Sequence, residues 1–429
     1  MYVRGLGTTL VPSPLFLYVH DKGQIRNIMK RSISNTILTK DYIFSKVSQI
    51  TIFSTYTGIS VKETLFMSLA SKIGTGSLAG IAFCIYYGGV GCIFWIWIIS
   101  FFLAINAFLE NYLALKYKEK DGIYYKGGPS FYIKNGLNRK KLAMFYSVVV
   151  IFSYLCGFLT IQNNTICTLF YDTYKIDPFI ISTVIAVLSF IIICKGLKSI
   201  SKLCEKIVPF MCVIYLIIGL IILIINFDKL GYAFSYIIKS AFNIKSFTSG
   251  ILGTLFIIMQ KSIFASEAGL GTGAIASGAT SSNNYVKQGF IGVVSTYFIN
   301  IVITTITGLI IILSNYKSVY FSNINGIEIT NYAFNYHLGH FGEVMLLILI
   351  LLFAFSTIIT GYYYGESNLK LFTSNSKIIF LLKIFTCIIL FIGGVSSSTF
   401  VWSLVDIFIA ILALVNIYAI FKLKDEVNL

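Results

Sequence analysis

Long apolar runs, separated by short polar segments, make up most of the sequence after residue 60. A hydrocarbon core about 30 Å thick takes roughly 20 helical residues to cross. Regular alternation of apolar and polar residues, the mark of a membrane β-strand, is absent from the sequence. The pattern predicts an all-α integral membrane protein with about ten transmembrane helices. They fall near residues 64–83, 90–115, 142–170, 178–194, 207–227, 248–265, 289–314, 343–364, 378–394 and 400–421.

Composition excludes a soluble globular protein. The 429 residues have a mean hydropathy of +0.83, and 57% of them are hydrophobic while only 12% are charged. Soluble domains carry about 25% charged residues, which they need to cover a water-facing surface. We therefore expect a membrane domain over residues 61–422. A cytoplasmic or interfacial segment at 1–60 precedes it, and a cytoplasmic tail at 423–429 follows it.

The basic residues are distributed unevenly between the two predicted sides of the membrane. Of the 33 Lys and Arg, 27 fall on one side and 5 on the other, with Lys72 inside a span. Lys and Arg collect on cytoplasmic loops and set the orientation. The asymmetry predicts a multi-pass protein of the cell membrane with both termini in the cytoplasm. No basic cluster lies on a polar segment large enough to bind nucleic acid.

The first predicted span contains the sequence SKIGTGS at residues 71–77. Two glycines around a threonine weaken a helix at mid-membrane depth. A break there frees backbone amides and carbonyls, and transporters use such discontinuous helices to hold a carboxylate and a cation. Small residues also let neighbouring helices pack closely. This segment alone supports both interpretations equally.

The third and eighth spans contain unusual polar positions. Gln162 and Thr165 share one helix face, whereas Asn163 is turned away. Consecutive amides need a cavity or a partner helix, and a polar site is the favoured interpretation over bonding between helices. Ser356 and Thr357 can offer hydroxyl oxygens to a small hard cation. They can equally bond back to carbonyls of their own helix.

Three carboxylates lie within or at the edge of predicted spans. Glu110, Glu267 and Asp406 are candidates for a proton or ion relay, or for ion pairs with Lys72 or a loop lysine. A structural pairing role is favoured for Glu110 and Glu267, because both lie close to predicted cytoplasmic ends. Asp406 lies early in the last span, and both roles stay open for it.

No motif indicates an enzyme. GxSxG, Walker A and HExxH sequences are absent. His337 and His340 fall in a predicted outer loop without a nearby cluster of metal-binding residues, and the eight cysteines form no CxxC pair. The GTGA sequence at 271–274 repeats the GTGS of 74–77, but at the inner end of its span. We therefore favour a coincidence of small residues over an internal repeat.

Seven segments spread over residues 58–421 carry a combined signal. They are SLASKIGTG at 68–76, GGVGCIFWIW at 88–97, KGGPSFYI at 126–133, IQNNTI at 161–166, EKIVPFM at 205–211, FASEAGLG at 264–271, and LFAFST at 352–357 with YYGE at 363–366. In this order they resemble the alanine or glycine:cation symporter family, also called sodium:alanine symporters. The combination is far more specific than any one segment.

This resemblance implies a fold of the bacterial leucine transporter type, with two five-helix repeats of inverted topology and broken first and sixth helices. It implies import of a small neutral amino acid, alanine or glycine, with Na⁺ or in some members H⁺, by alternating access. Membrane lipid is the expected surrounding, and no obligatory protein partner is evident. The expected substrate-binding residues are Gly74, Thr75, Gly76 and Ser77 in the first broken helix, Gln162 in the third span, and Gly250, Gly253 and Thr254 at the break in the sixth. The expected Na⁺ ligands are Ser356 and Thr357 with the carbonyls of Ala70 and Ile73.

The chain departs from the family pattern at several pocket positions. Ser77 and Ser266 stand where the family usually has Asn, and Gly361 replaces a Trp. A Gly-Gln-Gly-rich stretch is here the bulkier LFII at 255–258, and the family's first helix is reduced or missing. Two alternatives therefore stay open: a carrier for another small solute, and a homologue that binds an amino acid without transporting it.

Overall fold

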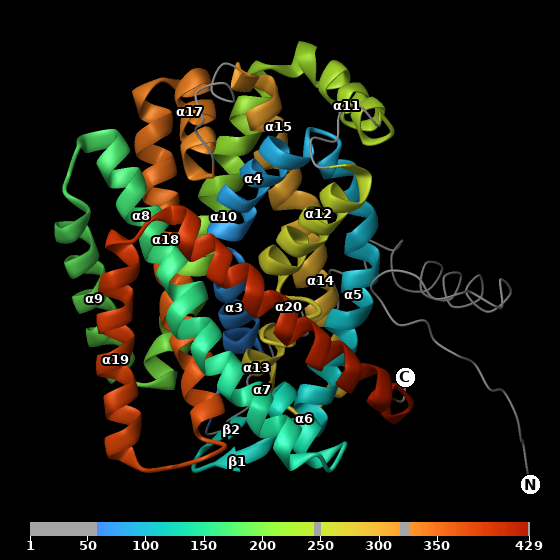
Figure 1. The fold of residues 1–429 in the computed structure, drawn as a ribbon, viewed down its shortest axis with the longest axis vertical. Helices are drawn as coiled ribbons and strands as arrows, with labels where there is room; N and C mark the ends of the chain where they lie inside the picture. The colour runs from blue at the N-terminus through green and yellow to red at the C-terminus, as the bar shows by residue number, and fades with distance from the viewer. Residues whose placement is uncertain (1–57, 244–249, 318–325, 428–429) are drawn as a thin grey trace, which may run out of the picture. The chain divides into compact units, whose positions relative to one another are not determined.

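The computed structural model describes residues 58–243, 250–317 and 326–427, so the N-terminal segment predicted over 1–60 lies almost wholly outside the described residues. Helices dominate the described part (Figure 1). The elements are α3 (Val61–Lys72), η2 (Thr75–Ser77), α4 (Ala79–Gly88), α5 (Cys92–Lys116), β1 (Glu119–Asp121), β2 (Tyr124–Lys126), α6 (Pro129–Asn135), α7 (Lys140–Phe152), η3 (Ser153–Phe158), α8 (Leu159–Tyr174), α9 (Pro178–Cys194), α10 (Leu197–Ile225), α11 (Phe227–Ala241), α12 (Gly250–Ser266), α13 (Gly273–Gly278), α14 (Tyr285–Tyr297), η5 (Phe298–Ile303), α15 (Thr304–Leu313), α17 (Ile327–Leu338), α18 (His340–Leu369), α19 (Ser376–Val395), α20 (Ser398–Leu423) and η6 (Lys424–Glu426).

Each of the ten predicted apolar runs coincides with helical segments among the described residues, and the run at 64–83 covers α3, η2 and α4. Among the described residues, seven helices are long and apolar enough to cross a membrane, and the bent pair Val61–Lys72 and Thr75–Gly88 makes an eighth if it counts as one span. The runs at 178–194 and 248–265 fall on α9 and α12, which have 17 residues each. A mostly helical architecture is thus confirmed. The count of ten spans and the inverted repeat stay predictions.

Local chemistry explains where several of these helices begin. Ser60 and Glu63 form a capping box at the start of α3, with bonds of 3.2 and 2.9 Å between each backbone N–H and the other side chain. Asp177 and Asn375 cap α9 and α19 with one bond each, in which the side chain accepts from a backbone N–H, and Pro178 occupies the first turn of α9. The first backbone N–H groups of a helix lack partners within it, and these side chains supply them.

Two spans contain a π-helical turn near the centre of the molecule. These turns are η3, between α7 and α8, and η5, between α14 and α15. A π-turn shifts the register of side chains within a helix and is frequent at functional sites. The η3 turn packs against α18 and α20, and η5 packs against α12.

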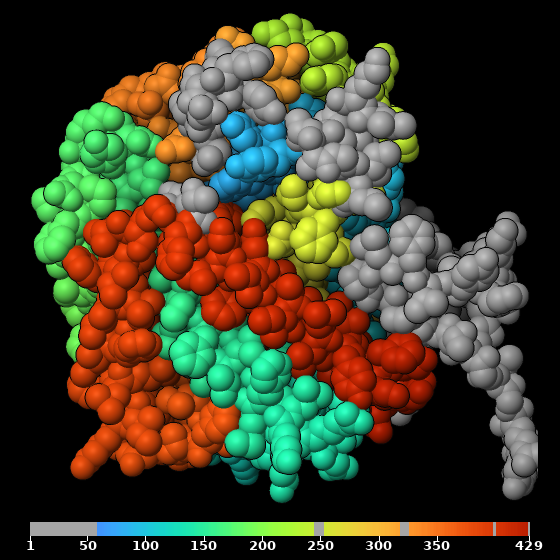
Figure 2. All heavy atoms as spheres, viewed as in Figure 1, coloured from blue at the N-terminus to red at the C-terminus, as the bar shows by residue number. Residues whose placement is uncertain are grey.

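The outward faces of the helices are apolar. In a water-soluble protein such continuous apolar surface is unusual, but next to lipid tails it is the favoured arrangement. Exposed large apolar side chains on three helices include Val184, Val187, Leu188 and Ile191 of α9, Ile217, Leu220 and Ile224 of α10, and Ile384 and Ile388 of α19. The helix α20 packs across α6, α7, η3 and α8, and its side chains cover much of the face seen in Figure 2.

The strands β1 and β2 form a short antiparallel hairpin, which turns at Gly122 with φ +65°. The hairpin and α6 lie at one end of the helices, with α11 and α17 at the opposite end (Figure 1). We call the first of these the hairpin end. Ile59, before α3, pairs with Thr280, after α13, and α13 contacts β2. The start of α3 therefore belongs to the hairpin end.

Candidate functional site

The first predicted span is broken where the glycine pattern places the break. The helix α3 ends at Lys72, Ile73 has φ −83° and ψ 72°, and Gly74 has φ −121° and ψ −149°. One 3₁₀ turn at Thr75–Ser77 then leads into α4, and the two halves are bent by 53°. The helix break is thus confirmed, and residues 73–78 are called the first break below. Close packing of an intact helix, the alternative interpretation, is wrong for this segment.

Two side chains from different helices converge on the first break. Gln162 of α8 accepts a hydrogen bond at its Oε1 from the backbone N–H of Thr75, at 3.1 Å. The hydroxyl of Thr357 in α18 lies 2.7 Å from the carbonyl of Ala70 and 2.8 Å from that of Phe353. A Cβ atom at Gly74 would lie 2.8 Å from Thr357 Oγ1 and 2.9 Å from Gln162 Oε1. A larger residue at this position would have to displace the two side chains, because they occupy the space that its Cβ atom needs.

The neighbouring amides of α8 serve a different purpose. Asn163 donates hydrogen bonds to the Ser182 hydroxyl and the Leu390 carbonyl, so it ties α8 to α9 and α19. Asn164 donates to two carbonyls at the end of α19. The hydroxyl of Thr165 bonds back to its own helix. The polar run thus divides: Gln162 faces the first break, and both asparagines hold helices together.

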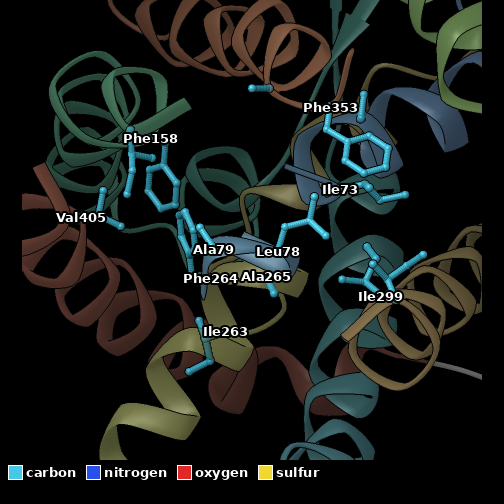
Figure 3. Packing of buried hydrophobic residues seen from close by; sticks show 14 of the residues in the cluster. Ile73, Leu78, Ala79, Phe158, Ile263, Phe264, Ala265, Ile299, Phe353 and Val405 are labelled. Atoms are coloured by element: carbon cyan, nitrogen blue, oxygen red, sulfur yellow. The ribbon is translucent and has the colours of Figure 1, made fainter. Parts of the chain in front are cut away.

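The two hydroxyls of α18 also differ. Ser356 donates to the Phe353 carbonyl of its own helix at 2.9 Å, which is one of the two predicted alternatives. Thr357 reaches across to Ala70 at the end of α3. Figure 3 shows the side chains of Ile73 and Phe353 close to each other in the same region. Of the four expected Na⁺ ligands, the structure thus brings together the Ala70 carbonyl and the Thr357 hydroxyl.

The expected break at Gly253 and Thr254 is not there, because α12 runs without interruption from Gly250 to Ser266. A Cβ atom at Gly88 would lie 3.1 Å from the Thr254 methyl group, so Thr254 lies at the far end of α4 from the first break. The interruption comes later, over residues 267–272, and is called the second break. Apolar residues at 255–258 continue the helix, whereas the second break contains backbone that only glycine adopts readily.

The second break is built from positive backbone angles. Glu267, Gly269 and Gly271 have φ of 54°, 96° and 80° before α13 begins at Gly273. The GTG sequence at 271–273 therefore lies at a helix break, as does the one at 74–76. Both copies thus interrupt a helix, whereas the preference for a coincidence over an internal repeat stays a prediction. The glycines at 269, 271 and 273 were the signal that could have located this break.

The two glutamates predicted to lie near cytoplasmic helix ends are fully buried beside the second break. Glu267 accepts from the hydroxyl of Tyr154 at 3.0 Å and from that of Ser71 at 3.2 Å. Glu110 accepts from the backbone N–H of Gly269 at 2.8 Å. It also accepts from the amide of Asn416 in α20, at 2.7 Å. Both carboxylates are thus fixed by donors from several helices.

The third intramembrane carboxylate, Asp406, forms an ion pair with Lys261 of α12 at 2.8 Å. The ammonium also lies 4.3 Å from the ring centre of Trp402, one turn away on α20, and 5.7 Å from that of Phe83 on α4. The charge asymmetry places Lys261 among the 27 basic residues of the predicted cytoplasmic side, but it lies inside a helix with its side chain only 8% exposed. The pair joins α12 to α20, with an aromatic ring of α4 beside it.

Aromatic rings cover the first break from the side of α12. A Cβ atom at Gly76 would lie 2.9 Å from the ring of Phe264. That ring stacks on Phe158 at 5.3 Å, and Figure 3 shows the two rings facing each other beside Ala79. Trp402 contacts Phe264 edge to face at 5.4 Å. These rings separate the first break from α20.

A narrow cavity lies on the other side of α4. Gly76, Gly80, Lys261, Ser262, Asn300 and Thr304 are among the residues that line it. Within the described residues, the side-chain oxygens of Asn300 and Thr75 are buried without a hydrogen-bond partner. Buried polar atoms usually have partners, and exceptions mark places where water or a ligand is bound. Asn300 was not singled out from the sequence, although it is the one amide in the apolar run 298–303.

The histidines of the HxxH sequence lie on the helices α17 and α18 and not in the predicted loop. His337 lies in α17 and contacts Asn226 and the Ile310 carbonyl, and His340 pairs with Glu343. Among the residues that the structure describes, no group of three or more His, Cys, Asp and Glu side chains could hold a metal ion.

Comparison with known proteins finds relatives along most of the chain. The model of the "Sodium:alanine symporter family" matches residues 28–428. The amino-acid carrier protein AlsT of Bacillus subtilis is 31% identical over 86% of this chain and 78% of its own length. The probable sodium/glutamine symporter GlnT of the same organism is 32% identical over 86% and 77%. The sodium/alanine symporter AgcS of Methanococcus maripaludis is 31% identical over 86% of this chain and 83% of its own length.

The fold also resembles a solved structure. The crystal structure of MhsT in complex with L-phenylalanine matches 85% of this chain and 89% of that chain, with a TM-score of 0.63 and 10% identity. At this identity the likeness concerns the fold, and it supports a membrane transporter fold.

Proposed function

Because the chain belongs to the sodium:alanine symporter family, we propose that it is a secondary active symporter of the cell membrane. It imports a small neutral amino acid, alanine or glycine, together with Na⁺ by alternating access, with both termini in the cytoplasm. Relatives named as sodium/alanine and sodium/glutamine symporters support Na⁺ coupling and a neutral amino acid as substrate. Transporter relatives also argue against an enzyme.

The observation that carries this proposal is the convergence of Gln162 and Thr357 on the first break. The break replaces part of the helical hydrogen bonding of residues 73–78 by bonds to side chains, and a ligand can replace such a side chain, as at the N–H of Thr75. The amide of Thr75 now bonds to Gln162 Oε1. A substrate carboxylate takes over this amide, and the side-chain NH₂ of Gln162 then turns to donate to the carboxylate.

The coupling ion is proposed to bind on the α3 side of the same break. Its ligands are the carbonyls of Ala70 and Ile73 with the hydroxyls of Ser356 and Thr357. Oxygen atoms suit a small hard cation, and two of these oxygens already lie 2.7 Å apart. Because residues 70–73 lead directly into the amides of the first break, each ligand orders the backbone that the other needs. Coupling of this kind is reciprocal.

The surroundings of the first break favour a small substrate. The ring of Phe264 lies against Gly76, and the Phe158 ring stacks on it. A side chain longer than one methyl group needs these rings to move. This supports alanine or glycine over a larger amino acid, although the Asn residues common in the family are serines here, at 77 and 266.

Alternating access requires that side-chain contacts on one side of the first break separate while the contacts on its other side stay closed. The ion pair of Lys261 and Asp406 lies beside α4, away from the hairpin end of the first break, and it joins α12 to α20. Movement of α4 and α12 away from α20 breaks this pair and separates Phe264 from Trp402. We propose this movement as the step that opens the site on that side.

The test is uptake of labelled alanine and glycine into proteoliposomes, with and without an inward Na⁺ gradient. A symporter accumulates substrate only with the gradient, and an unlabelled neutral amino acid competes. Substrate binding without uptake under either a Na⁺ or an H⁺ gradient would indicate a homologue that binds but does not transport. An uptake rate that is the same with and without the Na⁺ and H⁺ gradients would contradict symport.

A further inference from the structure

Three ionisable side chains are buried together where the two breaks meet. Lys72 ends α3, Glu110 lies in α5, and Glu267 begins the second break; their exposed fractions are 3%, 2% and 2%. Lys72 interacts electrostatically with both carboxylates. A Cβ atom at Gly273 would lie 3.3 Å from both Lys72 Nζ and Glu267 Oε2, so these two groups border the same small space. The three residues are called the charge cluster.

The charges in the cluster do not balance. Two carboxylates and one ammonium give a net charge of −1 when all three are ionised. In the part of the chain that the structure describes, the other ionisable groups that interact with Glu110 or Glu267 are tyrosines, which are neutral. These are Tyr132 of α6, Tyr146 of α7, Tyr154 of η3 and Tyr364 of α18. A buried site removes an excess charge most readily by taking up a proton.

The hydrogen bonds indicate which carboxylate can hold this proton. The donors to Glu110 Oε1 are N–H groups, of Gly269 and Asn416, which cannot accept a hydrogen bond. The donors to Glu267 are the hydroxyls of Ser71 and Tyr154, and a hydroxyl can both donate and accept. The two N–H donors on Oε1 favour the ionised form of Glu110. On Glu267 each oxygen faces a hydroxyl that can turn to accept, so Glu267 can change its protonation state and keep its partners.

Ser71 has the geometry that this change requires. Its hydroxyl lies 3.0 Å from the Ser68 carbonyl of its own helix and 2.9 Å from the hydroxyl of Tyr364. When Glu267 gains a proton on Oε2, the Ser71 hydroxyl turns its hydrogen to the Ser68 carbonyl and accepts from the glutamic acid. No hydrogen bond is lost, and no buried donor is left without a partner.

We propose that Glu267 is a proton-binding site: it takes up one proton from water and leaves Glu110 and Lys72 as a balanced ion pair. Lys72 stays an ammonium throughout. Because the cluster is assembled from α3, α5 and the second break, proton uptake depends on how the two breaks are arranged. The link to transport rests on the proposed function. The proton site itself does not, because it requires neither substrate nor gradient.

The test is infrared spectroscopy of the purified full chain, titrated with pH in the absence of substrate. A protonated carboxyl group has a C=O stretching band that disappears when the proton leaves. The wild-type protein is expected to show such a band, and Glu267→Gln is expected to lose it. Glu110→Gln is also expected to lose it, because Glu267 and Lys72 then balance each other. Ser71→Ala assigns the proton: it should shift the frequency of the band, since Ser71 contacts Glu267, and an unshifted band would place the proton on Glu110 and overturn the proposal. In Lys72→Met, which lacks the counter-charge, the band persists to higher pH.

A matched control is Glu205→Gln, since Glu205 is a partly exposed glutamate paired with Lys62. It is expected to leave the band unchanged. A wild-type protein without a titrating band, or a band that survives in Glu267→Gln, overturns the proposal. If Glu267→Gln does not elute as a folded monodisperse protein, the proposal is tested with Glu110→Gln and Lys72→Met. A carboxyl band that is unchanged in both variants overturns the proposal. If the wild-type protein shows the band but no symport, the proposed function is contradicted and the proton site is not.

Discussion

The side chain of Gln162 accepts a hydrogen bond from the backbone N–H of Thr75 at 3.1 Å. This contact joins the third predicted span to the first break, and it satisfies a buried amide that the missing helical turn would otherwise have paired. The amide is one of those that a substrate carboxylate needs. Gln162 therefore acts as a partner that a ligand can replace, and this role separates it from the asparagines beside it.

Gln162→Ala is expected to weaken substrate binding. A hydrogen bond to a charged group contributes about 1.5–3 kcal/mol, so the dissociation constant should rise roughly tenfold or more. The thermal midpoint should fall less than in Asn163→Ala, because Gln162 gives up one hydrogen bond, to the Thr75 N–H, whereas Asn163 gives up two. Binding of labelled alanine, measured beside a melting curve, checks both parts.

Asn163→Ala is the matched control on the next position of the same helix. Asn163 bonds to Ser182 and to the Leu390 carbonyl, so its loss should lower the free energy of unfolding by about 1–3 kcal/mol. Substrate affinity of the folded fraction should stay near the wild-type value. If both variants lose affinity equally, Gln162 has no special role at the site.

Gly74→Ala is expected to abolish or strongly reduce uptake. The added methyl group would lie 2.8 Å from Thr357 Oγ1 and 2.9 Å from Gln162 Oε1, and both side chains would have to move. Gly365→Ala is the control, since no atom lies within 4 Å of a Cβ atom there and the residue is within α18. Alanine in a helix is favoured over glycine by about 0.5–1 kcal/mol, so this variant should be as stable or slightly more stable. Uptake rates and melting curves are measured for both variants. Equal uptake by Gly74→Ala and Gly365→Ala would mean that the first break tolerates a side chain at residue 74.

Thr357→Val is expected to reduce the affinity for Na⁺ more than Ser356→Ala does. The Thr357 hydroxyl reaches the Ala70 carbonyl across the break, whereas that of Ser356 bonds to its own helix. Valine keeps the shape and removes the oxygen that approaches Ala70. The Na⁺ concentration for half-maximal uptake measures the difference. A larger effect of Ser356→Ala would reverse the assignment of these two residues.

Lys261→Met and Asp406→Asn should each destabilise the closed arrangement of α12 and α20. Removing one partner leaves a charge in a largely buried place, at a cost of about 1–3 kcal/mol, since Asp406 is partly exposed. The double variant Lys261→Asp with Asp406→Lys should recover part of this loss. Reaction of a cysteine placed at Ser262, which lines the adjoining cavity, with a water-soluble maleimide reports the opening. Equal labelling in wild type and both single variants would show that the pair does not hold the site closed.

Part of the site was predictable because its cause is local. Glycines at 74 and 76 weaken a helix wherever they stand, so the first break appears in the sequence and in the structure at the same place. The same reasoning misplaced the second break. Gly253 lies inside α12, where the apolar residues after it keep the helix continuous, and the interruption follows at Glu267. A run of glycines makes a helix break possible, but packing determines at which run the helix is actually interrupted.

Hydrophobic runs of helical length, short loops and the scarcity of charge determined by themselves that this protein is helical and suited to a membrane, because those properties depend on composition and spacing along the chain. Only the tertiary structure decided the partners of the buried charges. Lys72 and Glu267 are 195 positions apart in the sequence. Residues with such a separation come into contact only when their helices pack together. Asp406 could pair with Lys72 or a loop lysine as far as the sequence showed, and packing placed it against Lys261. A buried charge takes the nearest partner in space, and distance in space is not encoded in the order of the residues alone.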